Sequence, residues 1–334
     1  MSNQTFALVG SDSLLGREIR DIVATGAGGI DLRLIAADDE TPGKLTRVGD
    51  EPSLVAVLTA QSFAGARAIF LAGSAQSSLK ALELAEGSPD AAIIDLTYSA
   101  EERPDARLRA PAVEVEEEDA GTGVNIIAHP AAIALALFLR RLHAHDPVRR
   151  SVVQIFAPAT EHGAAGVEEL QGQTVSLLSF KSLPKAVFDS QLGFSMLARY
   201  GQEAPAALED SELRIERHLA TLLALPGEGE GVPMPSLRLI QAPVFHGYSM
   251  SAWVEFDGNP GVEALEDGLE TPSIDVRRGD FEPPNNVGQA GQGGISVGAI
   301  ALDRNEPEAC WFWLVADNLR LSAENAVAVA RQLL

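Results

Sequence analysis

Residues 6–16 read Phe6-Ala7-Leu8-Val9-Gly10-Ser11-Asp12-Ser13-Leu14-Leu15-Gly16, and this stretch decides the fold. The apolar run ending at Val9 is typical of a buried β-strand, and a helix is expected from Arg17 to Val23. A strand, a glycine turn and a helix in this order place a pyrophosphate at the helix N-terminus. The turn therefore predicts a dinucleotide site built from Gly10, Ser11, Asp12, Ser13, Leu14 and Gly16. Because Ser13 stands where glycine would suit close backbone approach, an ordinary turn without a ligand is the alternative.

An acidic stretch follows the second predicted strand, residues 31–37, and reads Asp38-Asp39-Glu40. A carboxylate here, Asp38 first, can accept a hydrogen bond from a ribose 2′-hydroxyl, whereas three carboxylates repel a 2′-phosphate. If a dinucleotide binds, the sequence favours NAD over NADP. A solvated acidic loop is the alternative.

Two more apolar runs, residues 68–74 and 91–96, are predicted as buried strands, and residues 78–85 between them have helical spacing. Gly73, near the end of the first run, is a further candidate for cofactor contact. Strands that alternate with helices predict an α/β fold with a Rossmann-like, doubly wound parallel sheet.

The second half of the chain has longer strands that carry aromatic residues, predicted at 151–157, 237–242, 251–256 and 310–315. A helix is expected at 209–225, loops at 226–235 and 283–294, and an amphipathic final helix at 322–334. The pattern predicts an α+β domain whose mixed or antiparallel sheet has one helix-covered face. The other face is available for dimerisation.

Between the halves, Ile126-Ile127 suits a strand end, and a helix with an apolar body is expected from Pro130 to Arg140-Arg141. A helix N-terminus can hold an anion or lower the pKa of a thiol. Ala131 and Ala132 carry no reactive group, so from pattern alone this helix start is expected only to pack.

Composition excludes several classes of function. The 334 residues carry a net charge of −22, which argues against nucleic acid and anionic membranes as partners. Neither a membrane span nor a leader is recognised, which together with a single cysteine predicts a cytoplasmic protein. Six scattered histidines without ligand spacing predict no metal site. The acidic run 114–119 is expected to be a solvated surface.

Six stretches, in order, resemble the aspartate-semialdehyde dehydrogenase family. They are the turn 7–16, the strand 69–74, Ile94-Asp95 (family IDNSS), Gly163 with Val167-Glu168-Glu169-Leu170 and Gln173 (family GAGKEAVEEL-x-x-Q), residues 242–249 (family RVPV-x-x-GHS), and residues 315–327 (family ADNLRKGAALNAV). The resemblance implies a dinucleotide-binding domain, 1–128 with 315–334, and a catalytic-type dimerisation domain, 129–314. It also implies NAD or NADP as cofactor, with Asn318 among its contacts, and a homodimer.

The family reduces an acyl phosphate to an aldehyde through a thioester, which needs a thiolate, a base, an orienting glutamine and substrate-binding arginines. In the register of the resemblance, Ala132 stands at the thiol, Ala157 at the glutamine, Gln241 at an arginine and Tyr248 at the base histidine. The phosphate-binding arginine falls near Glu101 and Arg103, and His218, after Glu216, replaces a lysine. These replacements resemble the degenerate Usg-type branch.

The remaining reactive side chains offer no substitute. Cys310 precedes Trp311-Phe312-Trp313 and is expected in the core, and His129, His162 and His246 are expected in loops or on the surface. Three hypotheses follow: a non-catalytic protein that binds a dinucleotide or a protein partner, an NAD(P)-dependent dehydrogenase or reductase with Tyr248 as proton donor, and a partner subunit of an active paralogue.

Overall fold

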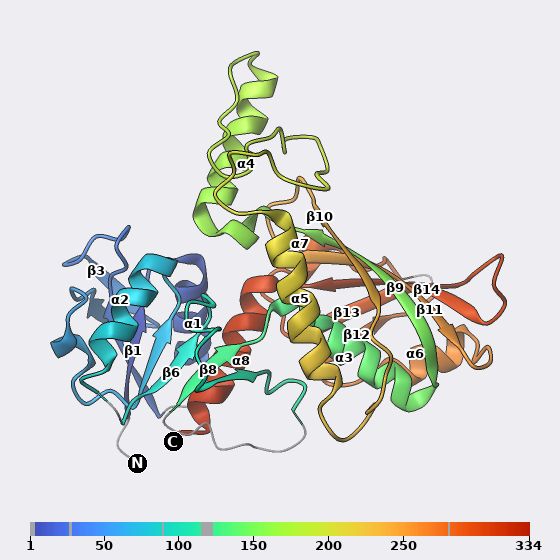
Figure 1. Ribbon diagram of the computed structural model, residues 1–334, viewed down its shortest axis with the longest axis horizontal. Coiled ribbons are helices and arrows are strands. Elements are labelled where there is room, and N and C mark those ends of the chain that lie inside the picture. The colour runs from blue at the N-terminus through green and yellow to red at the C-terminus, as the bar shows by residue number, and fades with distance from the viewer. Residues whose placement is uncertain (1–3, 27–28, 89, 115–122, 280) are drawn as a thin grey trace. The chain divides into compact units, whose positions relative to one another are not determined.

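The computed structural model describes residues 4–26, 29–88, 90–114, 123–279 and 281–334 (Figure 1). The chain divides into two compact units, Met1–Ala128 with Ser322–Leu334, and His129–Leu321. Each unit contains its own six-stranded sheet. Part of the acidic run predicted as solvated, residues 115–119, lies outside the described residues. Glu114 differs from that expectation because it pairs with the buried Arg109 at 2.9 Å.

The sheet of the first unit is parallel throughout, in the order β2-β1-β5-β6-β8-β7. Its strands are β1 (Gln4–Val9), β2 (Ile30–Ile35), β5 (Ala68–Leu71), β6 (Ala92–Asp95), β7 (Ala106–Arg109) and β8 (Val124–Ile127). The apolar runs of β5, β6 and β8 are buried at every residue, as parallel strands covered on both faces require. The predicted Rossmann-like sheet is confirmed.

Helices cover both faces of this sheet. Ile19 of α1 (Leu14–Thr25) and Val327 of α8 (Asn318–Arg331) share one apolar cluster with Phe6 and Leu8 of β1. Ala81 of α2 (Ala75–Ala85) packs in the opposite cluster, where the 3₁₀ turn η1 (Ala60–Phe63) also contributes. A small hairpin, β3 (Leu45–Val48) and β4 (Glu51–Leu54), lies beside α1.

The sheet of the second unit is mixed, in the order β10-β9-β11-β14-β13-β12. Its strands are β9 (Val148–Ala157), β10 (Ser236–Gln241), β11 (Tyr248–Phe256), β12 (Ile274–Arg277), β13 (Ile295–Leu302) and β14 (Ala309–Ala316). Pairing is parallel for β9 with β10 and for β12 with β13, and antiparallel elsewhere. The predicted mixed sheet is confirmed.

One face of the mixed sheet is covered by α3 (Pro130–His145), which packs against α5 (Leu208–Leu223) and α6 (Val262–Leu269) (Figure 1). Phe138 of α3 meets Phe312 of β14 edge to face at 5.1 Å. Because side chains alternate along a strand, Trp311 and Trp313 on either side of Phe312 point to the opposite face. Helix α3 is longer than predicted, since it continues past Arg141 to His145.

A helical arm completes the second unit. It consists of the 3₁₀ turn η2 (Ala159–His162), α4 (Gly163–Leu178) and the segment leading to α5. The buried Gln173 of α4 holds that segment by accepting hydrogen bonds from the amides of Leu192 and Gly193 and donating to two carbonyl groups. The predicted loop 283–294 contains one short helix, α7 (Asn286–Gln289).

Candidate functional sites

Two glycines bring the predicted cofactor turn against the end of the neighbouring strand. Gly10 has a φ of +83°, and a Cβ atom there would lie 2.3 Å from Cα of Gly73. A Cβ on Gly16 would lie 2.1 Å from the carbonyl oxygen of Gly10. These positions therefore require glycine for backbone packing alone, and their presence is not by itself a sign of a ligand.

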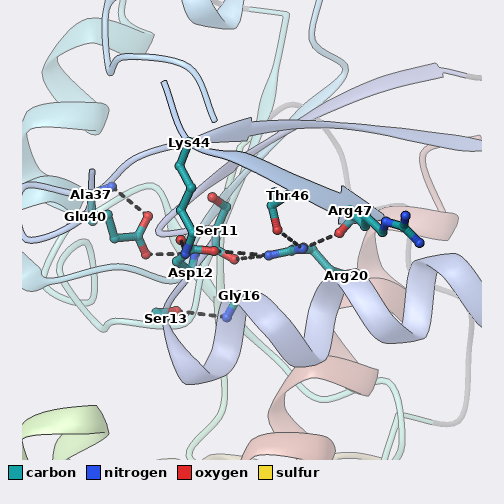
Figure 2. A network of polar contacts seen from close by, with 10 residues as sticks. All are labelled: Ser11, Asp12, Ser13, Gly16, Arg20, Ala37, Glu40, Lys44, Thr46 and Arg47. Atoms are coloured by element: carbon teal, nitrogen blue, oxygen red, sulfur yellow. Dashed lines mark hydrogen bonds and ion pairs between the residues drawn. The ribbon is translucent and has the colours of Figure 1, made fainter. Parts of the chain in front are cut away.

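The amide groups of residues 10–13 already have acceptors inside the unit. Those of Gly10 and Ser11 donate to the carbonyl of Ile35, and that of Ser13 to the carbonyl of Gly10. The amide of Asp12 donates to Oε1 of Glu40 at 2.9 Å, and Oε2 of Glu40 accepts from the amide of Ala37 at 3.1 Å (Figure 2). Burial raises the pKa of Glu40 despite these hydrogen bonds.

A second carboxylate stands in the same turn. Asp12 pairs with Arg20 of α1 at 3.3 Å and with Lys44 at 2.7 Å (Figure 2). Burial alone would raise the pKa of Asp12, but Lys44 and Arg20 outweigh it and lower the pKa. Arg20 also donates to Thr46 of β3, so that the ion pairs tie α1, the turn and the hairpin together.

Among the other predicted cofactor residues of the first unit, Ser13 and Asp38 have side-chain partners, whereas Ser11 has none within the part of the chain that the structure describes. Ser13 caps α1 by accepting from the amide of Gly16 at 2.9 Å and donating to the carbonyl of Ala72, while Leu14 begins the helix. Asp38 accepts a hydrogen bond from the hydroxyl of Ser74. The hydroxyl of Ser11 is buried without a hydrogen-bond partner among the described residues.

A pyrophosphate does not fit this turn as it stands. A cavity of about 260 Å³ at the end of β2 is lined by Ala36, Asp38, Glu40, Val57, Leu58 and Lys80, and its size suits part of a nucleoside. The amide of Asp12 that would meet a phosphate already donates to the carboxylate of Glu40, and the side chain of Asp12 is itself paired with Lys44 and Arg20. Glu40 thus occupies an amide that a phosphate in this turn would use.

In the second unit, the N-terminus of α3 is enclosed. His129 is the N-cap residue and accepts from the amide of Ala131 at 3.2 Å, and Ala131 and Ala132 are completely buried. The amide of His129 donates to Nδ1 of His218 of α5 at 2.9 Å. His129 is 1% exposed, so the expectation of a loop or surface position was wrong for this histidine: the chain folds α5 over it.

Glu161 of η2 links this helix start to β11. Its Oε1 lies 2.9 Å from Nε2 of His129, and its Oε2 accepts from the hydroxyl of the buried Tyr248. Burial alone would raise the pKa of Glu161, but His129 and the Tyr248 hydroxyl outweigh it, and the pKa falls to about 2. An ionised carboxylate therefore lies inside the second unit with two side-chain partners.

A second chain of hydrogen bonds passes through Gln241. Tyr200 donates to Oε1 of Gln241 at 2.7 Å, and Nε2 of Gln241 donates to the carbonyls of Ala157 and Ala242. His162 lies 2.8 Å from the Tyr200 hydroxyl, and burial raises the pKa of Tyr200 and lowers that of His162. The amide of Gln241 is thus fully used within the unit.

Asn318 is the one predicted cofactor residue that the second unit contains. Its Oδ1 accepts from the hydroxyl of Thr160 at 3.1 Å and from the amide of Gly247 at 3.2 Å, so it fixes the loops beside Glu161 and Tyr248. His246, half-buried, pairs with the neighbouring Asp317 at 2.7 Å. A cofactor role for Asn318 stays a prediction.

Residues 139–321 match the family model "Semialdehyde dehydrogenase, dimerisation domain". The chain belongs to the semialdehyde dehydrogenase family. Aspartate-semialdehyde dehydrogenase of Aquifex aeolicus is 27% identical over 336 residues, which cover 98% of this chain and 97% of that protein. A USG-1 protein homolog of Pseudomonas aeruginosa is 33% identical over 216 residues, which cover 63% of this chain and 62% of that protein. The predicted family and the likeness to its Usg-type branch are confirmed.

Solved semialdehyde dehydrogenases have the same architecture. A probable aspartate-semialdehyde dehydrogenase from Pseudomonas aeruginosa is 26% identical, with a TM-score of 0.83 over 99% of this chain and 98% of that one. The enzyme from Candida albicans, solved with NADP, is 14% identical with a TM-score of 0.69 over 99% of this chain and 98% of that one. At that identity the second likeness shows the fold alone.

For this semialdehyde dehydrogenase family member, sequence reasoning missed Glu161 as a site residue. It placed Glu40 in the acidic stretch of the cofactor site but missed its contact to the turn amide of Asp12. In the register used above, Glu161 falls on the first glycine of GAGKEAVEEL, and a carboxylate in place of a glycine was the available signal. Cys310 is confirmed as a core residue, with a pKa raised to about 11 by burial. Among the described residues no group of side chains could hold a metal ion, and none of the helices there has the length and apolarity to cross a membrane.

Proposed function

We propose that the chain is a semialdehyde dehydrogenase family protein that does not form a thioester and acts by binding. The observation that carries the proposal is Ala132, which offers a methyl group at the position that the resemblance assigns to the nucleophile. Cys310 supplies no replacement, because it is buried on β14 and its raised pKa keeps it a thiol near neutral pH.

The other three family positions support the same proposal. Ala157 contributes only a backbone carbonyl, which accepts from Gln241. Gln241 has no charge with which to hold a substrate carboxylate. Tyr248 directs its hydroxyl proton to Glu161, so it is not placed to accept a proton from a thiol.

The test is phosphate-dependent oxidation of aspartate semialdehyde with NAD or NADP, with the Aquifex aeolicus relative assayed in parallel. We expect a rate at least ~10⁴-fold below that of the relative, because loss of a nucleophile alone costs that much or more. Ala132→Cys should stay inactive, since Gln241 and Tyr248 are unchanged. Turnover by the unmodified chain, or an acyl adduct on Cys310 by mass spectrometry, would contradict the proposal.

A reductase that passes hydride directly, with Tyr248 as proton donor, is the second candidate. Its support is the position of Tyr248 in a buried polar chain with Glu161 and His129. Carbonyl reduction that is lost in Tyr248→Phe would favour this candidate. Unchanged reduction in that variant would remove it.

The binding partners follow from the two units. The three carboxylates of Asp38, Asp39 and Glu40 favour NAD over NADP if either binds. The uncovered face of the mixed sheet favours a second copy of this chain, and the matched dimerisation-domain model agrees with a homodimer. An active paralogue is the alternative protein partner, and separate elution of the two co-expressed chains would exclude it.

A further inference from the structure

We infer that Glu40 takes the place of a nucleotide phosphate in the β1–α1 turn, and that its carboxylate keeps NAD and NADP from binding to the first unit. The resemblance implies a dinucleotide at this turn. Glu40 is the residue that prevents the dinucleotide from binding there. This role of Glu40 concerns the first unit alone and does not depend on the absence of thioester chemistry.

The contacts of Glu40 are those that a phosphate would make. Anions at a strand–turn–helix junction are held by backbone amides that point to a common place. Here one carboxylate oxygen of Glu40 accepts a hydrogen bond from the amide of Asp12 in the turn, at 2.9 Å. The other accepts from the amide of Ala37 after β2, at 3.1 Å. The side chain thereby joins the two loops between which a dinucleotide would lie.

The surrounding structure holds this arrangement in place. The turn cannot shift away from Glu40 toward β5, because the backbone of Gly10 lies against Gly73 and leaves no room even for a Cβ atom. Asp12 is fixed between Lys44 and Arg20, so both of these cations are already paired with a carboxylate of the turn (Figure 2). A pyrophosphate would therefore have to displace Glu40 from the amide of Asp12, and Lys44 and Arg20 would already be engaged by Asp12.

Removal of Glu40 should therefore create an anion site. The amides of Asp12 and Ala37 lose their acceptor, and the cavity of about 260 Å³ that Glu40 lines becomes continuous with the turn. A charge-assisted hydrogen bond is worth ~10- to 100-fold in an equilibrium constant. We expect Glu40→Ala to bind NAD at least ~10-fold more tightly than the unmodified chain.

The experiment is calorimetric titration of the full chain, Glu40→Ala and Glu40→Gln with NAD and NADP at neutral pH. The matched control is Asp31→Ala, which removes the same charge from an exposed side chain near the start of β2, at the other end of that strand from the turn. The unmodified chain and the control should show no saturable binding below millimolar nucleotide. Glu40→Ala should bind NAD, and NADP more weakly because Asp38 and Asp39 remain.

Two outcomes would overturn the inference. One is micromolar binding of either nucleotide to the unmodified chain. The other is the absence of any gain in Glu40→Ala, provided that its circular dichroism matches that of the control.

A second measurement protects against a variant that folds poorly. In ¹H–¹⁵N spectra, inorganic phosphate should shift the amide signals of Asp12 and Ala37 in Glu40→Gln and leave them in place in the unmodified chain. Equal shifts in both proteins would show that Glu40 does not compete with anions, and would overturn the inference without reference to nucleotide binding.

Discussion

Glu40 and Glu161 are both carboxylates that accept hydrogen bonds inside the unit that contains them. Glu40 uses backbone amides, whereas Glu161 uses the side chains of His129 and Tyr248. Buried charges are stable only when partners compensate for lost water, and for Glu161 those partners are strong enough to hold the pKa at about 2. Each of these two carboxylates is thus part of the hydrogen bonding of its own unit.

The lowered pKa of Glu161 predicts how acid affects stability. A carboxyl group whose pKa falls from 4.5 to about 2 on folding stabilises the folded state fully above pH 4.5. That contribution, ~3 kcal/mol, is lost as the pH falls from 4.5 toward 2. Urea unfolding of Glu161→Gln should therefore give a large deficit at pH 7 that shrinks markedly by pH 3. The exposed Glu168→Gln is the matched control, and a deficit independent of pH would contradict the assignment.

At the scale of elements, side chains of α4 fix the position of the segment that follows it through hydrogen bonds to its backbone. Glu169 accepts from the amides of Val187 and Phe188, and one turn later Gln173 holds Leu192 and Gly193. The segment has little regular hydrogen bonding of its own between α4 and α5. Its conformation therefore depends on these two side chains of α4, together with the backbone pairing of Leu197 with Gln241 and the contact of Tyr200 to Gln241.

Gln173→Leu tests this dependence, because leucine keeps the bulk but neither donates nor accepts. Loss of a buried amide that bonds four backbone groups should lower the free energy of unfolding by ~2–4 kcal/mol. Trypsin, which can cut at Lys181, Lys185 and Arg199, should then cleave the segment much faster. Gln171→Leu, on the exposed side of the same helix, should change neither the free energy of unfolding nor the rate of tryptic cleavage. Equal digestion of both variants would rule out the anchoring role.

The sequence predicts elements whose pattern is local. The apolar runs of β1, β5 and β6 and the capped start of α1 are recognisable from neighbouring residues alone. Strand β13 was missed because Gly298 and a bulge between Gly298 and Ala301 break its alternation. The partners of Glu40 and Glu161 were missed for another reason: Asp12 lies 28 residues from Glu40 and Tyr248 lies 87 from Glu161, so only the folded chain brings them together.

For the whole molecule, the uncovered face of the mixed sheet is the surface most suited to a second copy. Val152 and Trp253 are partners across β9 and β11, Trp253 faces Trp311 of β14, and Phe156 packs near Trp313 at 6.1 Å. Val152 is 40% exposed and Trp311 39%, which is unusual for such side chains in the middle of a sheet.

Val152→Glu tests the dimer. We expect light scattering to give about twice the 35.3 kDa chain mass for the unmodified protein and one chain mass for the variant, because a charge would be buried without a partner. Val57→Glu, at a valine of the first unit that is 57% exposed, should leave the mass unchanged. If the Val152→Glu variant has the same mass in light scattering as the unmodified protein, the interface lies elsewhere.

All three tryptophans of the chain, Trp253, Trp311 and Trp313, lie on that one sheet face. The indole groups of Trp253 and Trp311 donate to the same carboxylate oxygen of Asp303, and that of Trp313 donates to the carbonyl of Pro284. Intrinsic fluorescence excited at the red edge therefore reports the second unit only. A denaturation curve followed by this emission and one followed by circular dichroism will coincide only if the two units unfold together.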